Sequence, residues 1–215
     1  MSTRSPTPEG DEWWRPIPAG TSRDALLVLA ARSMRAFADG FVSVLLPIYL
    51  LEIGFGVLAI GAIITATLMG SAILTLWVGM FAHRHRRRGM LLGASILMAA
   101  TGAGFCGISA FWPLLLIAFV GTLNPSSGDV SVFLPLEHTV LAQTAEPRRR
   151  TSLFARYSLA GALAGALGAL AAALPDLATD RMGVDHLAAM RIMFVLYALI
   201  GVATFVTYTC RFEVR

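Results

Sequence analysis

The chain has 215 residues, of which 56% are hydrophobic and only 14% are charged, and its mean hydropathy is +0.70. So much apolar surface cannot be buried in one water-soluble core of this size, which excludes an ordinary soluble domain and predicts an integral membrane protein. The net charge of +4 comes from arginines that cluster at the ends of apolar segments, where membrane topology explains them, so we expect no nucleic-acid partner.

Apolar segments of about 20 residues or more recur along the chain, which is long enough for a helix to cross a bilayer. They lack the alternation of barrel strands. We therefore expect an all-α membrane protein with six transmembrane helices over residues 24–51, 56–82, 89–109, 112–143, 151–174 and 187–210. The expected organisation is a flexible cytoplasmic tail (1–22), a six-helix transmembrane domain (23–211) and a cytoplasmic end (212–215).

Two arginine-rich loops set the expected orientation. They are "HRHRRRG" (83–89) and "EPRRR" (146–150), whereas the turns near 52–55 and 109–112 carry no basic residue. Basic loops remain on the cytoplasmic side, so both termini are expected in the cytoplasm and the protein in the cell (inner or plasma) membrane. The acidic segment "PDLATDRMGVD" (175–185) is then expected as an outer turn.

The fifth predicted helix contains "GALAGALGALAAAL" (161–174), in which almost every residue is small. Small side chains let helix backbones approach closely in lipid. The stretch therefore predicts tight helix packing.

Three charged residues interrupt the first apolar helix. Arg32, Arg35 and Asp39 are spaced i, i+3 and i+7, so they form one stripe on a helix face. An isolated charge near the bilayer centre costs on the order of 3 kcal/mol or more, so the stripe should face protein or a water-filled cavity. Two interpretations remain open: Arg35 and Asp39 pair and lock the fold, or the stripe serves transport.

The fourth predicted helix carries the polar stretch "GTLNPSSGDVSVFLPLEHTV" (121–140). As one straight helix, the 34 residues from Phe111 to Thr144 would reach about 50 Å, well beyond a hydrocarbon core of about 30 Å. Asn124, Pro125 and Gly128 supply breaks. Asp129 and Glu137 then fall at the depth of the charged residues on the first helix. The matching depth predicts a buried cluster in which Arg32 or Arg35 meets Asp129 or Glu137.

The histidines support no metal site. His83 and His85 flank Arg84 in a loop without a nearby carboxylate or cysteine, so we assign no metal and expect no cofactor. His138 is either a side chain that reaches from the helix to the membrane interface or a member of a proton relay with Glu137.

The segment "GMFAHRHRRR" (79–88) resembles the loop signature Gly-x-Leu-Ala-Asp-Arg-x-Gly-Arg-Arg of the major facilitator superfamily. His83 replaces the aspartate of that signature, and Arg86 replaces its second glycine. The arginine signature of the family's fourth helix and the Gly-Pro signature of its antiporters are missing. The positions that match are Gly79, Ala82, Arg84, Arg87 and Arg88.

The resemblance implies the N-terminal half of a secondary active transporter that moves a small molecule or ion by alternating access. Such a transporter encloses a central site lined by its first and fourth helices. A second six-helix half is implied as partner, because members of the family normally have twelve spans; the chain is a fragment, a split half or a half that pairs with a copy of itself. The expected pathway residues are Arg32, Arg35, Asp39, Asn124, Asp129 and Glu137.

Two other classes of function remain as alternatives. A membrane scaffold or assembly subunit would use the same charged residues for folding alone. A six-helix intramembrane protease would need a serine in a Gly-x-Ser-Gly setting, but Ser127 lacks the leading glycine, and His186 sits at a helix start. We therefore expect no catalytic residue and no enzyme activity.

Overall fold

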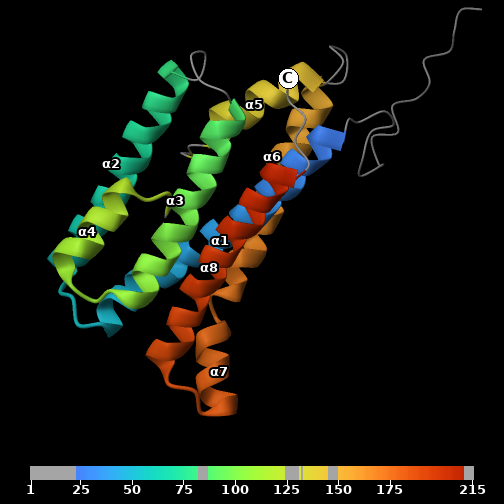
Figure 1. The fold of residues 1–215 in the computed structure, drawn as a ribbon. Coiled ribbons are helices and arrows are strands. Elements are labelled where there is room, and N and C mark those ends of the chain that lie inside the picture. The colour runs from blue at the N-terminus through green and yellow to red at the C-terminus, as the bar shows by residue number, and fades with distance from the viewer. Residues whose placement is uncertain (1–22, 82–86, 124–130, 132, 145–149, 211–215) are drawn as a thin grey trace, which may run out of the picture.

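The computed structural model describes residues 23–81, 87–123, 131, 133–144 and 150–210. Helices account for nearly all of these residues, and this part of the chain contains no strand, which confirms the all-α class. The helices are α1 (Arg23–Glu52), α2 (Val57–Phe81), α3 (Arg87–Gly107), α4 (Phe111–Val120), α5 (Phe133–Thr144), α6 (Arg150–Ala171), α7 (Leu174–Met182) and α8 (His186–Cys210) (Figure 1).

Five helical segments are long and apolar enough to cross a membrane, and α4 is a shorter apolar helix. The arrangement agrees with a six-helix bundle in which α4 and α5 share the fourth crossing. The continuous helix expected over 112–143 is instead interrupted, because Gly121 leaves α4 in an extended conformation and the next helix begins only at Phe133. Asn124, Pro125 and Gly128, the breaks expected from the sequence, lie outside the described residues.

The segment expected as an outer turn forms a helix, α7. Pro175 stands in its first turn, where a missing amide proton costs no hydrogen bond, and Asp176 and Arg181 complement the dipole at its two ends. Gly183 ends the helix with a φ of 65°, a left-handed conformation that glycine adopts without strain. The prediction of a turn was therefore wrong between Pro175 and Met182.

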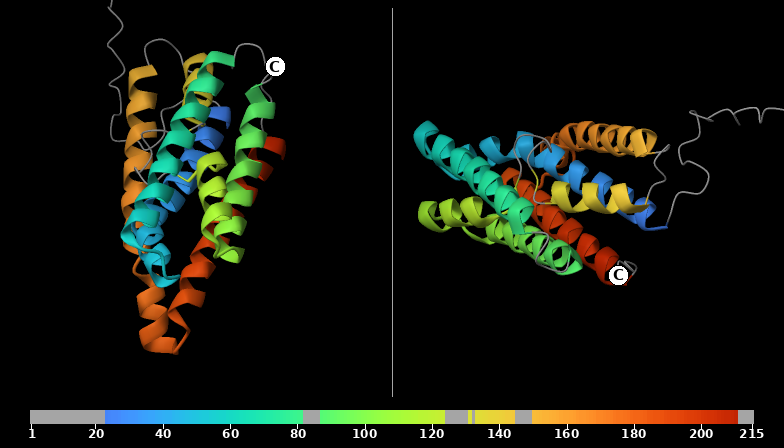
Figure 2. Two further views of the ribbon diagram at one scale, coloured as in Figure 1. Left: turned by 90° about the vertical axis from the view of Figure 1, so that its left-hand side faces the viewer. Right: turned by 90° about the horizontal axis from the view of Figure 1, so that it is seen from above.

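The helices pack in pairs: α1 against α6, α3 against α8, and α2 against α4. Figures 1 and 2 show α6 on one flank of the bundle, α2 with α4 on the other, and α1 and α8 between them. Consistent with that place, α1 is the most buried of the candidate spans. Large apolar side chains point outward from the flanking helices, as a lipid-facing surface requires, among them Leu163 and Leu167 on α6 and Leu76 on α2.

Glycines set the closest approaches. A Cβ added at Gly168 of α6 would lie 2.0 Å from the carbonyl oxygen of Phe37, and one at Gly40 of α1 would lie 2.1 Å from the carbonyl oxygen of Gly165. No other residue type fits at Gly168 or Gly40 unless the helices separate. The glycine-rich stretch thus brings the α6 backbone against α1, which agrees with the expectation of tight packing.

Candidate functional site

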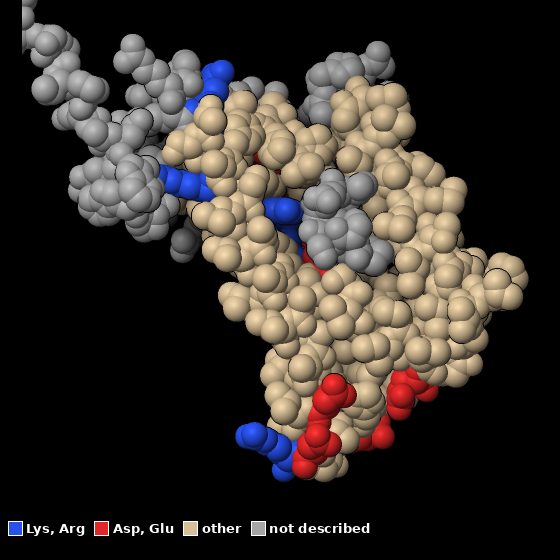
Figure 3. Space-filling model, turned by 180° about the vertical axis from the view of Figure 1, so that it is seen from behind, with Lys and Arg blue, Asp and Glu red and all other residues tan. Residues whose placement is uncertain are grey.

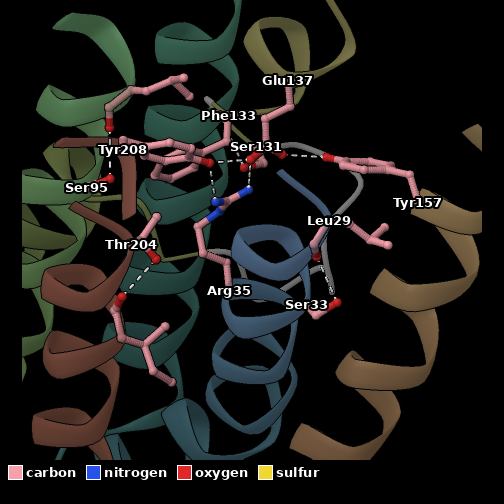
Figure 4. Close-up of polar contacts among 12 residues, drawn as sticks. Leu29, Ser33, Arg35, Ser95, Ser131, Phe133, Glu137, Tyr157, Thr204 and Tyr208 are labelled. Atoms are coloured by element: carbon pink, nitrogen blue, oxygen red, sulfur yellow. Dashed lines mark hydrogen bonds and ion pairs between the residues drawn. The ribbon is translucent and has the colours of Figure 1, made fainter. Parts of the chain in front are cut away.

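The centre of the site is an ion pair between Arg35 on α1 and Glu137 on α5. The guanidinium nitrogen Nη2 of Arg35 donates to Oε1 of Glu137 over 2.6 Å. The Arg35 side chain is 3% exposed and that of Glu137 is fully buried, so water does not screen the pair. The ring of Phe133, one helical turn before Glu137, lies 3.9 Å from the guanidinium carbon and adds a cation–π contact (Figure 4).

Two tyrosines complete the shell around the carboxylate. Tyr208 on α8 donates to Oε1 of Glu137 over 2.5 Å, and Tyr157 on α6 donates to Oε2 over 2.7 Å. The hydroxyl of Tyr208 also accepts a hydrogen bond of 3.0 Å from Nη1 of Arg35. Figure 4 shows the four side chains converging from four different helices. We call Glu137, Arg35, Tyr157, Tyr208 and Phe133 the Glu137 cluster.

The cluster matches one of the pairings expected from depth. Arg35 meets Glu137, whereas Asp129 and Asn124 lie outside the described residues. Within the described part of the chain Arg35 forms its ion pair with Glu137 and not with Asp39, so the local i, i+4 pair that we considered is not the one formed.

Tyr157 and Tyr208 were not singled out from the sequence. A useful clue was present, because a tyrosine inside an apolar helix needs a partner for its hydroxyl. All four tyrosines of the chain follow this rule: they are buried, and each donates to a protein oxygen. The other two donations are Tyr49 to the carbonyl of Phe105 and Tyr197 to the carbonyl of Thr122.

The break after α4 is stabilised by side chains from two other helices. Tyr197 on α8 donates to the carbonyl oxygen of Thr122 over 3.2 Å, and Ser71 on α2 donates to that of Leu123 over 3.3 Å. Non-helical backbone at membrane depth is stable only where protein or cavity water satisfies its polar groups. These two donations satisfy carbonyls that a continuous helix would have paired internally.

Asp39 lies beside this break. Asp39 is only 6% exposed. Its carboxylate interacts electrostatically with the guanidinium groups of Arg35 and Arg32 and with the hydroxyl of Tyr197. Among the described residues it has no hydrogen-bond partner, whereas the carboxylate of Glu137 accepts three hydrogen bonds. Among the described contacts the two buried carboxylates therefore differ: protein groups donate to both oxygens of Glu137, and none of the described donors binds Asp39.

Arg32 is the third charge of the stripe and occupies a different environment. Its guanidinium lies over the ring of Tyr157 at 5.4 Å, and its Nε is buried without a hydrogen-bond partner among the described residues. A Cβ added at Gly161 of α6 would lie 2.8 Å from that Nε, so the missing side chain makes room for the guanidinium. His138 packs edge-on against the rings of Tyr157 and Phe154.

The loop motif of the sequence is described only in part. Gly79 has open space where a Cβ would stand, and a guanidinium nitrogen of Arg88 donates to the carbonyl oxygen of Thr209, tying the start of α3 to the end of α8. Ala82, His83 and Arg84 lie outside the described residues, as does the side chain of Arg87. The role of the motif therefore stays a prediction.

The opposite end of the bundle is acidic and exposed. Figure 3 shows acidic atoms gathered at the α7 end, with basic atoms beside them. His186, which begins α8, lies 2.8 Å from Oδ1 of Asp176 and 3.7 Å from Oε1 of Glu52. Ser127, the serine considered for a protease, lies outside the described residues. In the part of the chain that is described, no group of three or more His, Cys, Asp or Glu could hold a metal.

Comparison with known proteins adds two findings. A family model described as Major Facilitator Superfamily matches residues 28–214, which is most of the chain. A relative described as an uncharacterized membrane protein, YJR124C, from Saccharomyces cerevisiae is 28% identical over 179 residues, which cover 82% of this chain and 40% of the relative. The chain thus spans about 40% of the length of that relative.

Proposed function

Because this chain belongs to the Major Facilitator Superfamily, we propose that it forms half of a secondary transporter that moves a small solute across a membrane by alternating access. One observation carries the proposal: buried charges on α1 lie beside a fourth span whose helix is interrupted. Discontinuous helices near the midplane are how transporters of several folds build substrate and ion sites. Asp39, with no described hydrogen-bond partner beside that interruption, is the carboxylate best placed to face a solute or ion.

A second six-helix half supplies the opposite wall of the passage in this proposal. Support comes from the chain's share of its yeast relative, about 40% of the length. The remainder of a longer polypeptide, a separate chain or a second copy of this chain could provide that wall. The strongly exposed apolar surfaces of α2 and α6 offer area for lipid and for such a partner.

We place the protein in the cell membrane with both ends of the chain in the cytoplasm. The start of α1, the end of α2, the start of α3 and the end of α8 all lie at one end of the bundle (Figure 1). The arginine-rich loops belong to that end, which positive charge keeps in the cytoplasm. A reporter that is active only outside the cytoplasm should stay inactive when fused after residue 215 and become active when fused between Gly183 and Asp185.

Thiol accessibility tests the wet passage. In protein with Cys106 and Cys210 replaced by alanine, a cysteine at position 39 should react with a membrane-impermeant, charged thiol reagent in at least one state of the transporter. A cysteine at position 163 provides the control, because Leu163 is 59% exposed on the outer face of α6 and should react only with a lipid-soluble reagent.

The same measurement separates transport from a scaffold role. If position 39 resists the charged reagent in every state while the lipid-soluble reagent reaches it, the charges only hold the helices together and the transporter proposal is wrong. The conservative change Asp39→Asn then gives a second readout. A transporter predicts folded protein with altered solute movement, and a scaffold predicts an effect on folding alone.

A further inference from the structure

We propose that Arg32 is the binding site for an anionic carboxylate or phosphate group of the transported solute, an inference that rests on the proposed transport function and names the substrate class. The sequence alone did not discriminate, because two arginines and several carboxylates share the region. The structure discriminates through the way these charges are paired.

Arg35 is already neutralised. Oε1 of Glu137 accepts a hydrogen bond of 2.6 Å from Nη2 of Arg35. Both side chains are buried, so Arg35 has its counter-ion within the protein. Both oxygens of Glu137 are in turn occupied, Oε1 by Arg35 and Tyr208 and Oε2 by Tyr157. The ion pair of Glu137 in the described part of the chain is with Arg35, and none is formed with Arg32.

Arg32 has no such partner in the described part of the chain. Its Nε is buried and unbonded, and the ring face of Tyr157 at 5.4 Å supports the charge without neutralising it. Asp39 is seven residues along α1, about 10 Å of helix rise, and although its carboxylate interacts electrostatically with Arg32, the two form no ion pair among the described contacts. A guanidinium inside a membrane domain is stable only with a partner, and an oxyanion is the group that its planar donors fit best.

The surroundings of Arg32 also suit a ligand. Gly161 presents no side chain where the guanidinium passes α6, and the half-buried ring of His138 lies against Tyr157 on the α5 side.

The chain offers a matched pair of glycine substitutions as a test. In Gly161→Ala the new Cβ would stand 2.8 Å from Nε and 3.1 Å from Nη2 of Arg32, so the flexible guanidinium must move while its charge remains. In Gly165→Ala, one turn further along the same face, the new Cβ would meet its nearest neighbour, a carbonyl oxygen, at an ordinary 3.6 Å. The pair separates the position of Arg32 from the general packing of α6.

The measurement is thermal unfolding of the full-length protein in nanodiscs with millimolar inorganic phosphate, acetate or succinate, glucose as an uncharged control and constant ionic strength. At least one anion should raise the unfolding temperature of the wild type, and glucose should not. Gly161→Ala should weaken the apparent affinity for that anion about tenfold or more, Arg32→Gln should abolish the effect, and Gly165→Ala should retain it. Arg32→Lys, which keeps the charge, should restore part of it.

The proposal is overturned if no anion stabilises the wild type, or if the stabilisation survives in Arg32→Gln. Nanodiscs of phosphatidylcholine alone and with added phosphatidylglycerol separate a soluble anion from a lipid headgroup. Stabilisation that appears only with the anionic lipid would overturn the assignment to a transported solute. If position 39 proves wet while no anion binds, this inference alone fails, whereas a dry position 39 removes the transport function itself.

Discussion

Replacement of Glu137 by glutamine should be among the most destabilising changes available in this chain. The substitution keeps the size of the side chain and removes its charge, so the Arg35 guanidinium remains buried without a counter-ion. Breaking a buried ion pair by removing one partner costs about 3–5 kcal/mol, because the remaining charge stays out of water. We expect Glu137→Gln to lower the free energy of unfolding by an amount in that range.

Substitutions of Tyr157 and Tyr208 measure how much of this loss in unfolding free energy comes from each hydrogen bond to Glu137. Tyr157 is the described donor to Oε2, so Tyr157→Phe removes one hydrogen bond to a charged acceptor, worth about 1.5–3 kcal/mol. Tyr208→Phe removes the donation to Oε1 and also the acceptor for Nη1 of Arg35, but Oε1 keeps Arg35. Both single changes should therefore cost less than Glu137→Gln. In the Glu137→Gln background each should lose much of its effect, because the charged acceptor is gone.

Equilibrium unfolding in mixed detergent micelles, followed by tryptophan fluorescence, provides the free energies. Glu52→Gln is the matched control, since that carboxylate is 46% exposed and its nearest basic group, Nδ1 of His186, lies 3.7 Å away. An exposed pair of this kind is worth about 1 kcal/mol or less. If Glu137→Gln is as mild as Glu52→Gln, or if the effects of the tyrosine changes simply add to it, the cluster does not hold the helices together as argued.

Three further changes test the packing, the break and the α7 cap. Gly168→Ala would place a Cβ 2.0 Å from a carbonyl oxygen of α1, so it should lower the unfolding temperature at a cost of about 1–3 kcal/mol. Gly165→Ala, where the new Cβ would make an ordinary contact at 3.6 Å, should be nearly neutral. Equal effects of the two changes on the unfolding temperature would contradict the packing of α6 on α1. Tyr197→Phe leaves the carbonyl of Thr122 without its described donor and should speed amide exchange around the break, with a loss of about 1–3 kcal/mol. Gly183→Ala forces a φ of 65° on alanine and should destabilise the end of α7 by about 1 kcal/mol, seen as faster exchange there and unchanged exchange elsewhere.

The sequence predicted the parts of the fold that depend on composition along one segment. Apolar runs of sufficient length predicted the all-α membrane class and the six-helix architecture. The small residues of 161–174 predicted tight packing of that helix, and the structure shows that its close neighbour is α1. The charged stripe of α1 was also visible, because its i, i+3, i+7 spacing is a property of a single helix.

Partners that come from distant segments were harder to predict. Depth matching put Glu137 at the level of Arg35, but nothing in the sequence said that Tyr157 and Tyr208 would reach the same carboxylate from two other helices. A hydroxyl in an apolar helix can bond a backbone carbonyl, as Tyr49 does, or a side chain, and only the packing decides. The packing of the helices likewise determines that Arg35 pairs with Glu137 across the bundle and not with Asp39, four residues along its own helix.

The outer helix α7 was missed for a different reason. The segment 175–185 was expected as an outer turn because it lies between two apolar spans and holds three aspartates against one arginine. Residues of the same segment also begin and end a helix: Pro175 and Asp176 in the first turn and Gly183 after the last. Interpreting Pro175, Asp176 and Gly183 as helix-terminal residues would have predicted this nine-residue helix between two apolar spans.

The hydrogen bonds of α8 explain how a fourth span with a break keeps a defined shape. Tyr197 binds the carbonyl of Thr122 where α4 ends, and Tyr208 binds Glu137 within α5. The two tyrosines are eleven residues apart, about 16 Å of helix rise, so one rigid helix fastens the fourth span on both sides of its interruption. A change in the angle between α4 and α5 would therefore break one of these bonds unless α8 moved as well. Since Glu137 also binds Arg35 of α1 and Tyr157 of α6, the fourth span should move together with α1, α6 and α8 as one body.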